Sequence, residues 1–488
     1  MPLRYPLAWF LVVQASLLLV RLDLLSLWGD ELFTLQTVQQ PVEEMLRILK
    51  MDIHPPLYYL LAHWWIELPL PWGTMEKIRA LSAVWMLVAT VLLDRLMLRK
   101  LPVSGRVLGL ALWTLSPCAV LYGRMGRSYA MQAALTIAVA YCFWRLRQQP
   151  GRRQTLIAAG CGVLLLYTHY VPAIAAIGAF SVVLAVDALR GRGSGTLLHW
   201  VGALMLIGAA YLPWALTLTD ALRKWSEASG FSSRYQVTRS AVLEHGVKTA
   251  FGGVSLLLGE SLPWISMLLA VPFVALLVVF LRRALWRRDA AFLLFAVAAM
   301  LGYYGVARWV SYPFIPARLL WLLPFIWVWV AAQPQVWSGW RRVAVLCLLL
   351  ANALSLASYF VKQHYLNKGY AAPLREIAAE VRNSGGGTVY VDTFNTDATS
   401  FAYYAGRTFP VRFLAEPAAA VNGRIWVLRN THDVSPGGLS SKAEAALCAG
   451  KAITRTGYVR YDRWQRVVMR AIGIDGPPAY FLQLTRCG

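Results

Sequence analysis

Long apolar segments recur along the first three quarters of the chain, and no other feature constrains its fold as strongly. Each holds about 17 to 22 residues, enough for a helix to cross a hydrocarbon core of roughly 30 Å. The first lies between Leu7 and about Leu27. Further candidate spans follow at roughly 80–98, 106–122, 128–146, 155–170, 172–188, 197–216, 263–282, 290–308, 318–333 and 343–360. The sequence predicts a polytopic α-helical membrane protein with about eleven transmembrane helices.

Composition supports this interpretation. Of the 488 residues, 58% are hydrophobic and only 15% are charged, so the chain is more apolar than a typical soluble protein. The first apolar segment is interpreted as a span and not as a cleavable signal peptide, because it is long and lacks a cleavage site with small residues.

The distribution of basic residues predicts the topology. A net charge of +23 would suit a nucleic-acid partner, but the basic residues cluster in short loops between the spans, as the positive-inside rule expects. If those loops are cytoplasmic, the segments 28–79, 123–127, 168–172, 217–262 and 309–318 and the tail after 361 all lie on the opposite side. We therefore expect no nucleic-acid partner and an outward-facing tail.

The tail differs from the rest of the chain. The segments GGGTVYVDTF, FPVRFL, GRIWVLRN and AYFLQLTRC predict short strands, and PLREIAAEVRN and SSKAEAALCAG predict helices. The glycine run 385–387 predicts a turn, since no Lys or Ser/Thr follows at P-loop spacing. We predict a transmembrane domain over 1–360 and a small extracytoplasmic α/β domain over 361–488.

Two of the six cysteines, Cys448 and Cys487, lie in this tail, which the topology places in an oxidising compartment. The other four lie within predicted spans, where a free Cys is an ordinary small apolar residue. We predict a disulfide between Cys448 and Cys487.

The first outer loop, 28–79, predicts two juxtamembrane helices. PVEEMLRILKM starts with a helix-initiating proline and places its apolar residues on one face, as in a helix that lies along a membrane surface. HPPLYYLLAHWWIELPLPW predicts an aromatic-rich interfacial helix that is too short and interrupted to be a span.

Ionisable side chains gather at the outer ends of the spans, where each is costly and is by default a candidate for function. They include two carboxylates, two histidines and four arginines. These residues, with two tyrosines beside them, are Asp30, Glu31, His54, Arg124, Arg127, Tyr129, His169, Tyr170, Arg308 and Arg318. Their one-sided placement predicts an active site on the outer face.

Each of these residues has a simpler interpretation as well. Asp30 and Glu31 in SLWGDELFT can be a solvated helix cap or partners of an arginine, or a general base or metal ligands. His54 can be a polar residue ahead of a proline turn, and His169 an interfacial histidine. Arg127 can extend to lipid head groups. Together, however, carboxylates suit proton removal from a hydroxyl, and the cations suit a phosphate.

Several motifs resemble the GT-C superfamily of membrane glycosyltransferases, in particular the protein O-mannosyltransferase and lipid A aminoarabinose transferase group. They are WGDELFT, HPPLYYLLAHWW, IRALSAV, LSPCAVLYGRMGRSYAM and LLLYTHYVPA, in that order, and the resemblance covers residues 1 to about 330. It implies an enzyme of the bacterial cytoplasmic (inner) membrane that transfers a sugar from a polyprenyl phosphate to a lipid, glycan or protein acceptor at the outer surface.

The resemblance also implies roles for individual residues. Asp30 is expected to be the base that accepts the proton of the acceptor hydroxyl, with Glu31 supporting it. Cations are expected to bind the donor phosphate, and tyrosines to line the substrate site. The expected phosphate-binding residues are His54, Arg124, Arg127, His169 and Arg318, and the expected lining residues are Tyr58, Tyr59, Tyr129 and Tyr170. A single displacement would invert the anomeric carbon.

The chain departs from this group in ways that bear on metal binding. Met125 and Gly126 stand where relatives often carry an acid before the arginine, and Arg318 replaces an Arg-Tyr pair. A divalent metal needs several oxygen or imidazole ligands. We expect no required cofactor, while a divalent metal at Asp30 and Glu31 stays open.

A transporter or flippase of lipid-linked sugars is the main alternative. Such a protein should place ionisable residues through the bilayer midplane and often has repeated halves, neither of which is visible here. A polymerase or ligase that uses a diphosphate-linked glycan would centre on a late outer loop, whereas the acidic loop here is early. The basic stretch YDRWQRVVMR near the end can be a solvated face or a patch on anionic head groups.

Overall fold

The computed structural model describes most of the chain and divides it into two compact units. The described residues are all except 1–5, 53, 192–193, 230–238, 288–294, 296, 303–315, 394–396, 415–422, 433–434, 436–437 and 472–475. The first unit comprises Met1–Leu22, Thr34–Gly259 and Ile265–Leu356, and the second Asp23–Phe33, Glu260–Trp264 and Ala357–Gly488. The second unit thus joins the tail to two short segments from earlier in the chain.

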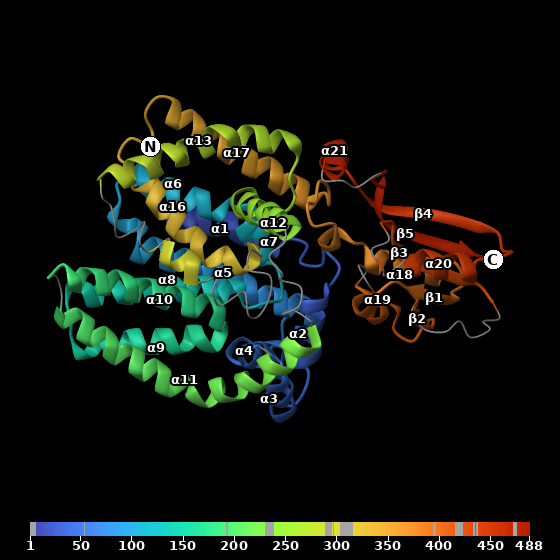
Figure 1. Ribbon diagram of the computed structural model, residues 1–488, viewed down its shortest axis with the longest axis horizontal. Helices are drawn as coiled ribbons and strands as arrows, with labels where there is room; N and C mark the ends of the chain where they lie inside the picture. Colours follow the sequence, from blue (N-terminus) through green and yellow to red (C-terminus); the bar gives the residue numbers. More distant parts are fainter. Residues whose placement is uncertain are drawn as a thin grey trace. The chain divides into compact units, whose positions relative to one another are not determined.

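The first unit is helical (Figure 1). Its helices are α1 (Pro6–Leu19), α3 (Val42–Met51), α4 (Leu57–Ile66), α5 (Thr74–Leu96), α6 (Val103–Thr114), α7 (Pro117–Gly123), α8 (Tyr129–Gln148), α9 (Arg152–Thr168), α10 (Tyr170–Leu189), α11 (Ser194–Ser229), α12 (Arg239–Leu258), α13 (Trp264–Arg287), α15 (Pro316–Leu319), α16 (Leu323–Ala331) and α17 (Trp340–Phe360). The boundary between the units falls within α2 (Gly29–Val38), and the ends of α13 and α17 extend into the second unit.

Five helices in the described residues are long and apolar enough to cross a membrane, and a sixth span results if α6 and α7 are counted together. The predicted span at 106–122 is bent by 52° between these two helices. The bend has a local cause, since Ser116 accepts a hydrogen bond from the Ala119 amide and Pro117 occupies the first turn of α7. The total of about eleven spans stays a prediction.

Small side chains allow close packing inside this unit. Helix α8 packs against α5 and α9, and its buried residues include Ala130, Ala133 and Ala134. In a membrane the hydrophobic effect does not drive helices together, so helix association depends on van der Waals packing. Small residues favour that packing because they let helix backbones approach closely. This packing fixes the start of α8, where the arginine-containing turn lies.

The second unit contains a five-stranded sheet with the order β2-β1-β3-β5-β4. The strands are β1 (Thr388–Val391), β2 (Val411–Phe413), β3 (Ile425–Asn430), β4 (Ile453–Arg460) and β5 (Tyr480–Cys487), and the helices are α18 (Leu374–Asn383), α19 (Ala398–Ala405), α20 (Leu439–Leu447) and α21 (Arg463–Ala471). β1 pairs in parallel with β2 and β3, while β5 is antiparallel to β3 and β4. The predicted α/β character is confirmed.

Sequence analysis missed β4, α19 and α21. β4 is mostly exposed along its length and carries polar residues, so it has no apolar alternation to reveal it. The predicted glycine turn is present before β1. Gly387 has a φ of 129°, and a Cβ there would lie 2.5 Å from the Arg424 carbonyl oxygen, so this position requires glycine.

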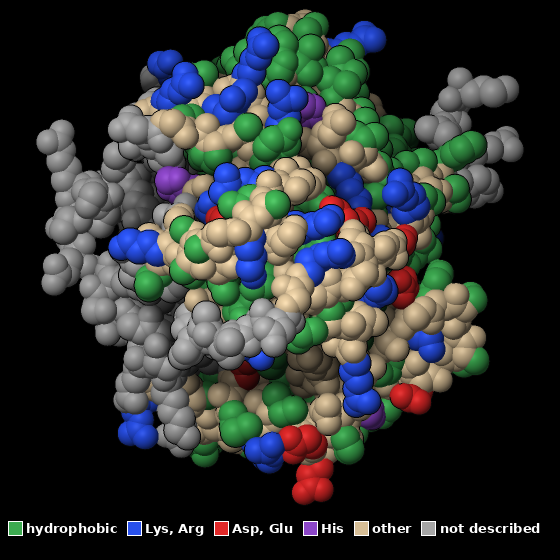
Figure 2. All heavy atoms as spheres, turned by 90° about the vertical axis from the view of Figure 1, so that its right-hand side faces the viewer, with side chains coloured by type: hydrophobic (Ala, Val, Ile, Leu, Met, Phe, Trp, Pro, Cys, Tyr) green, Lys and Arg blue, Asp and Glu red, His purple; other side chains and the backbone are tan. Residues whose placement is uncertain are grey.

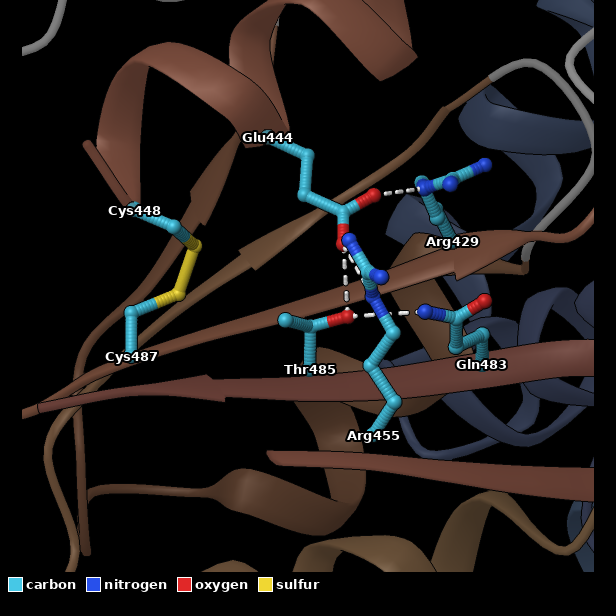
Figure 3. The surroundings of a disulfide bond; sticks show 7 residues. All are labelled: Arg429, Glu444, Cys448, Arg455, Gln483, Thr485 and Cys487. Carbon is cyan, nitrogen blue, oxygen red and sulfur yellow. Dashed lines mark hydrogen bonds and ion pairs between the residues drawn. A yellow bond between two sulfur atoms is a disulfide. The ribbon is translucent and has the colours of Figure 1, made fainter. Parts of the chain in front are cut away.

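Cys448 and Cys487 form a disulfide whose Cα atoms lie 5.2 Å apart. It links the end of α20 to the last strand, beside a buried carboxylate, Glu444 (Figure 3). Arg429 pairs with Glu444, and the Thr485 hydroxyl donates to it over 2.7 Å. The disulfide and this ionic network together hold α20 on the sheet.

Candidate functional site

Arg127 is the centre of a buried polar cluster in the first unit. It lies in the turn between α7 and α8 and is only 6% exposed. Its Nη1 donates to the Thr34 hydroxyl and to the Tyr59 hydroxyl, each over 3.0 Å. Its Nη2 lies 2.7 Å from Nε2 of His54. Three distant segments therefore meet on one guanidinium group.

His54 is held in turn by Asp52, whose Oδ1 lies 3.0 Å from the His54 Nδ1. Because the guanidinium is always a donor, the His54 Nε2 accepts a hydrogen bond from Arg127, and the His54 Nδ1–H donates one to the Asp52 carboxylate. Sequence analysis missed Asp52. The acid two residues before the histidine in MDIHPP was the signal that could have revealed it.

The two adjacent tyrosines of α4 hold the arginine turn from two sides. Tyr59 contacts the Arg127 side chain, as described above. The Tyr58 hydroxyl lies 2.8 Å from the Ser82 hydroxyl, which donates to the Arg127 carbonyl oxygen over 3.0 Å. Tyr58 is 1% exposed, so its contacts support the turn from the core.

A second group of polar side chains lies within electrostatic range of this cluster. His169 interacts electrostatically with Arg318, His54 and Arg127. Tyr170 interacts with Arg318 in the same way. His169 lies at the break between α9 and α10, where its backbone is extended, and Tyr170 is the first residue of α10.

Several buried atoms of this second group have no hydrogen-bond partner within the described residues. They are Nδ1 of His169, the hydroxyl oxygen of Tyr170 and Nη1 of Arg318. Unpaired buried polar atoms are costly unless a ligand or water satisfies them. An anionic ligand with several oxygen acceptors fits this set, because Arg and Tyr are donors and a neutral His can be one.

Arg124 and Tyr129 have visible structural roles. Nη1 of Arg124 donates to the carbonyl oxygens of Leu17 and Leu18 over 2.7 and 2.9 Å, which satisfies the last turn of α1. Tyr129 packs edge to face on Tyr122, with ring centroids 5.9 Å apart. Two expected roles stay predictions: phosphate binding by Arg124 and lining of the substrate site by Tyr129. Arg308 lies outside the described residues.

Asp30 and Glu31 occupy the first turn of α2, in the second unit. Carboxylates are favoured at a helix N-terminus, where the backbone amides and the helix dipole are positive. Glu31 is only 4% exposed, so it is not a solvated cap. The same helix continues into the first unit with Thr34, which accepts a hydrogen bond from Arg127.

The described part of the chain contains no group of three or more His, Cys, Asp or Glu side chains that could hold a metal ion. A metal at Asp30 and Glu31 would need further ligands from substrate or water. The question of a metal cofactor is left open.

The fold of the chain was compared with those of known proteins. No family model matches the chain, and a search of the curated proteins found no match. The structure is similar to ArnT from Cupriavidus metallidurans, solved with undecaprenyl phosphate, with a TM-score of 0.53 and 11% identity over 98% of this chain and 97% of that one. It also matches the Archaeoglobus fulgidus oligosaccharyltransferase in its apo form, with a TM-score of 0.47 and 12% identity over 99% and 89% of the chains.

The first of these two similarities covers nearly the full length of both proteins, although the sequences have diverged far. The similarity therefore supports the fold but assigns no role to any individual residue. The chain has the fold of the Cupriavidus metallidurans ArnT structure, which agrees with the resemblance noted from the order of its motifs.

Proposed function

We propose that this protein is a membrane glycosyltransferase that moves a sugar from a polyprenyl phosphate to an acceptor hydroxyl at the outer face of the bacterial inner membrane. The observation that carries the proposal is the buried cluster around Arg127, with unpartnered polar atoms of Arg318, His169 and Tyr170 in its electrostatic range. The ArnT structure with the same fold was solved with undecaprenyl phosphate, a ligand of the class that this cluster suits.

The proposed donor phosphate binds between Arg127 and Arg318. When the bond from the anomeric carbon to the phosphate oxygen breaks, a second negative charge develops on the departing phosphate. Cationic donors fixed before the reaction stabilise that charge without reorganisation. Because Arg127 is already held by three side-chain partners, its orientation costs little when the donor arrives.

The acceptor hydroxyl forms the new bond to the anomeric carbon and gives its proton to Asp30. We assign the base to Asp30 because it is more exposed than the buried Glu31, and a base must reach the acceptor. Glu31 supports it with negative charge that stabilises the oxocarbenium-like transition state. Asp30, Glu31 and Thr34 all lie in helix α2, within five residues of one another in the sequence.

The outward orientation is supported by the disulfide. Disulfides persist in oxidising compartments, and the cysteines that form this one lie in the second unit. The basic loops of the chain, which favour the cytoplasmic side, include none of its residues.

Release of free polyprenyl phosphate tests the proposal. Purified protein is mixed with a panel of polyprenyl-phosphate sugars and with lipid, glycan and peptide acceptors. The wild type should release polyprenyl phosphate from one donor, and Asp30→Asn should reduce the rate by about 10²- to 10⁴-fold. Glu67→Gln, an exposed acid of the same loop, is the matched control and should keep the wild-type rate.

The outcome separates an enzyme from a transporter. Donor binding without release, unchanged by Asp30→Asn, would turn the assignment toward a flippase of lipid-linked sugars. In that case the same donor should cross a proteoliposome membrane in a manner that depends on Arg127.

A further inference from the structure

Helix α21 in the second unit exposes two of its apolar side chains, Val467 and Val468. Trp464, Val467 and Val468 are spaced so that they share one face of the helix. Val467 is 62% exposed and Val468 is 49% exposed, whereas the polar Gln465 is 7% exposed. An amphipathic helix of a soluble domain would bury the valines and expose the glutamine.

The neighbouring face of α21 is basic. Arg463, Arg466 and Arg470 are spaced three and four residues apart, and Arg463 and Arg470 are exposed. The stretch RWQRVVMR contains no acid. In Figure 2, Lys and Arg side chains spread over the face of the molecule drawn there, with apolar side chains between them. Valines and a tryptophan beside arginines are the pattern of a helix that lies in a membrane interface.

The buried contacts of α21 attach it to the segment that follows helix α17. The Asp462 Oδ1, directly before the helix, lies 3.0 Å from the His364 Nδ1. The Gln465 amide nitrogen donates to the Tyr365 carbonyl oxygen over 3.0 Å. The buried glutamine therefore attaches α21 to residues 364–365.

That segment lies close to the ends of two candidate membrane spans, α17 and α13. α17 ends at Phe360, four residues before His364, a distance of at most about 14 Å for an extended chain. The His364 carbonyl accepts from the Leu262 amide over 2.8 Å, and α13 begins at Trp264. His364, Tyr365, Leu262 and the adjoining ends of the two helices, Phe360 and Trp264, all belong to the second unit, as α21 does.

We propose that α21 lies on the membrane surface and binds anionic phospholipids. Val467 and Val468 enter the interfacial layer with the partly exposed edge of Trp464 beside them, and the arginines pair with lipid phosphates. A second copy of the chain is a poorer occupant, because docking this face on itself would bring arginines together. The proposal holds whatever reaction the protein catalyses, and it gives the second unit a second attachment to the bilayer besides the ends of the spans.

Site-directed spin labelling of the full-length protein tests this proposal. The four free cysteines are replaced by alanine, the Cys448–Cys487 disulfide is kept, and a nitroxide is attached at Val467→Cys. The matched control is Ala445→Cys, an exposed position on α20 of the same unit. Both are reconstituted in nanodiscs of phosphatidylcholine with phosphatidylglycerol, and accessibility to oxygen and to a nickel chelate is measured.

The label at 467 is expected to be reached by oxygen and to lose nickel accessibility several-fold relative to the label at 445. Arg463→Gln with Arg470→Gln should restore nickel accessibility at 467, and so should nanodiscs without phosphatidylglycerol. Equal nickel accessibility at 467 and 445 would overturn the proposal. So would loss of both oxygen and nickel accessibility, which indicates a protein partner, and so would protection that is the same with and without anionic lipid.

Discussion

The imidazole Nε2 of His54 lies 2.7 Å from Nη2 of Arg127, a residue 73 positions later in the chain. This contact joins the segment between α3 and α4 to the turn between α7 and α8. Because Asp52 holds the opposite nitrogen of the same ring, the aspartate, the histidine and the arginine form one chain of hydrogen bonds. The orientation of Arg127 therefore depends on residues that would not touch the proposed donor themselves.

Arg127→Lys is expected to lower the rate of polyprenyl phosphate release by roughly 10²- to 10³-fold. A lysine keeps the charge but lacks the planar group that reaches Thr34, Tyr59 and His54 at once. Rates are measured at saturating donor, and the folded state of each variant is checked by its melting temperature. Arg152→Lys, at an exposed position at the start of α9, is the control. A wild-type rate in Arg127→Lys would remove the arginine from the proposed mechanism.

Asp52 and His54 are expected to act through the same contact. Asp52→Asn and His54→Ala should each lower turnover, and the double variant should be no worse than His54→Ala alone, because the aspartate works only through the imidazole. Residues in one hydrogen-bonded network typically couple by about 0.5 to 3 kcal/mol. The four rates of this double-mutant cycle give the coupling directly. Additive effects of the two substitutions would show that Asp52 acts independently of His54.

Sequence patterns predicted the architecture well because apolar length and strand composition are local properties. The strands around Val389, Val427 and Leu484 are apolar and buried, so each can be recognised from its own short stretch of sequence. β4 does not, because it is held by its partner β5 and exposes most of its side chains. Helix α21 escaped detection since its apolar face does not point to a core.

The functional roles of the candidate residues stay predictions, but their contacts show what a sequence can and cannot reveal. Residue type and position at the ends of predicted spans make His54, Arg127 and His169 candidates for function. Their pairing could not be inferred, because contacts between residues 73 positions apart leave no local pattern. Arg124 shows the converse, because this cation, three residues before Arg127 in the sequence, donates to backbone carbonyls at the end of α1. Only the folded chain distinguishes these two arginines.

Replacing both Cys448 and Cys487 with alanine is expected to destabilise the second unit by about 4 kcal/mol, the loop entropy of a 39-residue separation. Cys347→Ala, at a free cysteine in α17, should have a much smaller effect. Thermal unfolding without reductant is the measurement. Maleimide labelling of the denatured wild type should modify four thiols of the six cysteines. Modification of all six would mean that no disulfide forms in the isolated protein.

Lys368 should make the stability of the second unit depend on pH. Burial lowers the pKa of Lys368 to about 8, although Asp462 opposes the shift. Between this value and the ordinary lysine pKa of about 10.4, unfolding takes up a proton, so the free energy of unfolding rises with pH. Below pH 8 the ammonium is charged in both states, and the full cost of burying the charge applies.

Lys368→Met removes this titration. The melting temperature of the variant minus that of the wild type should therefore be largest near pH 7 and shrink steadily toward pH 10. Lys442→Met, at an exposed position on α20, is the control and should give a difference that does not change with pH. A difference for Lys368→Met that is flat or grows with pH would show that the ammonium is not destabilised by burial. In that case its contacts with the Arg460 carbonyl and the Tyr461 ring would outweigh desolvation.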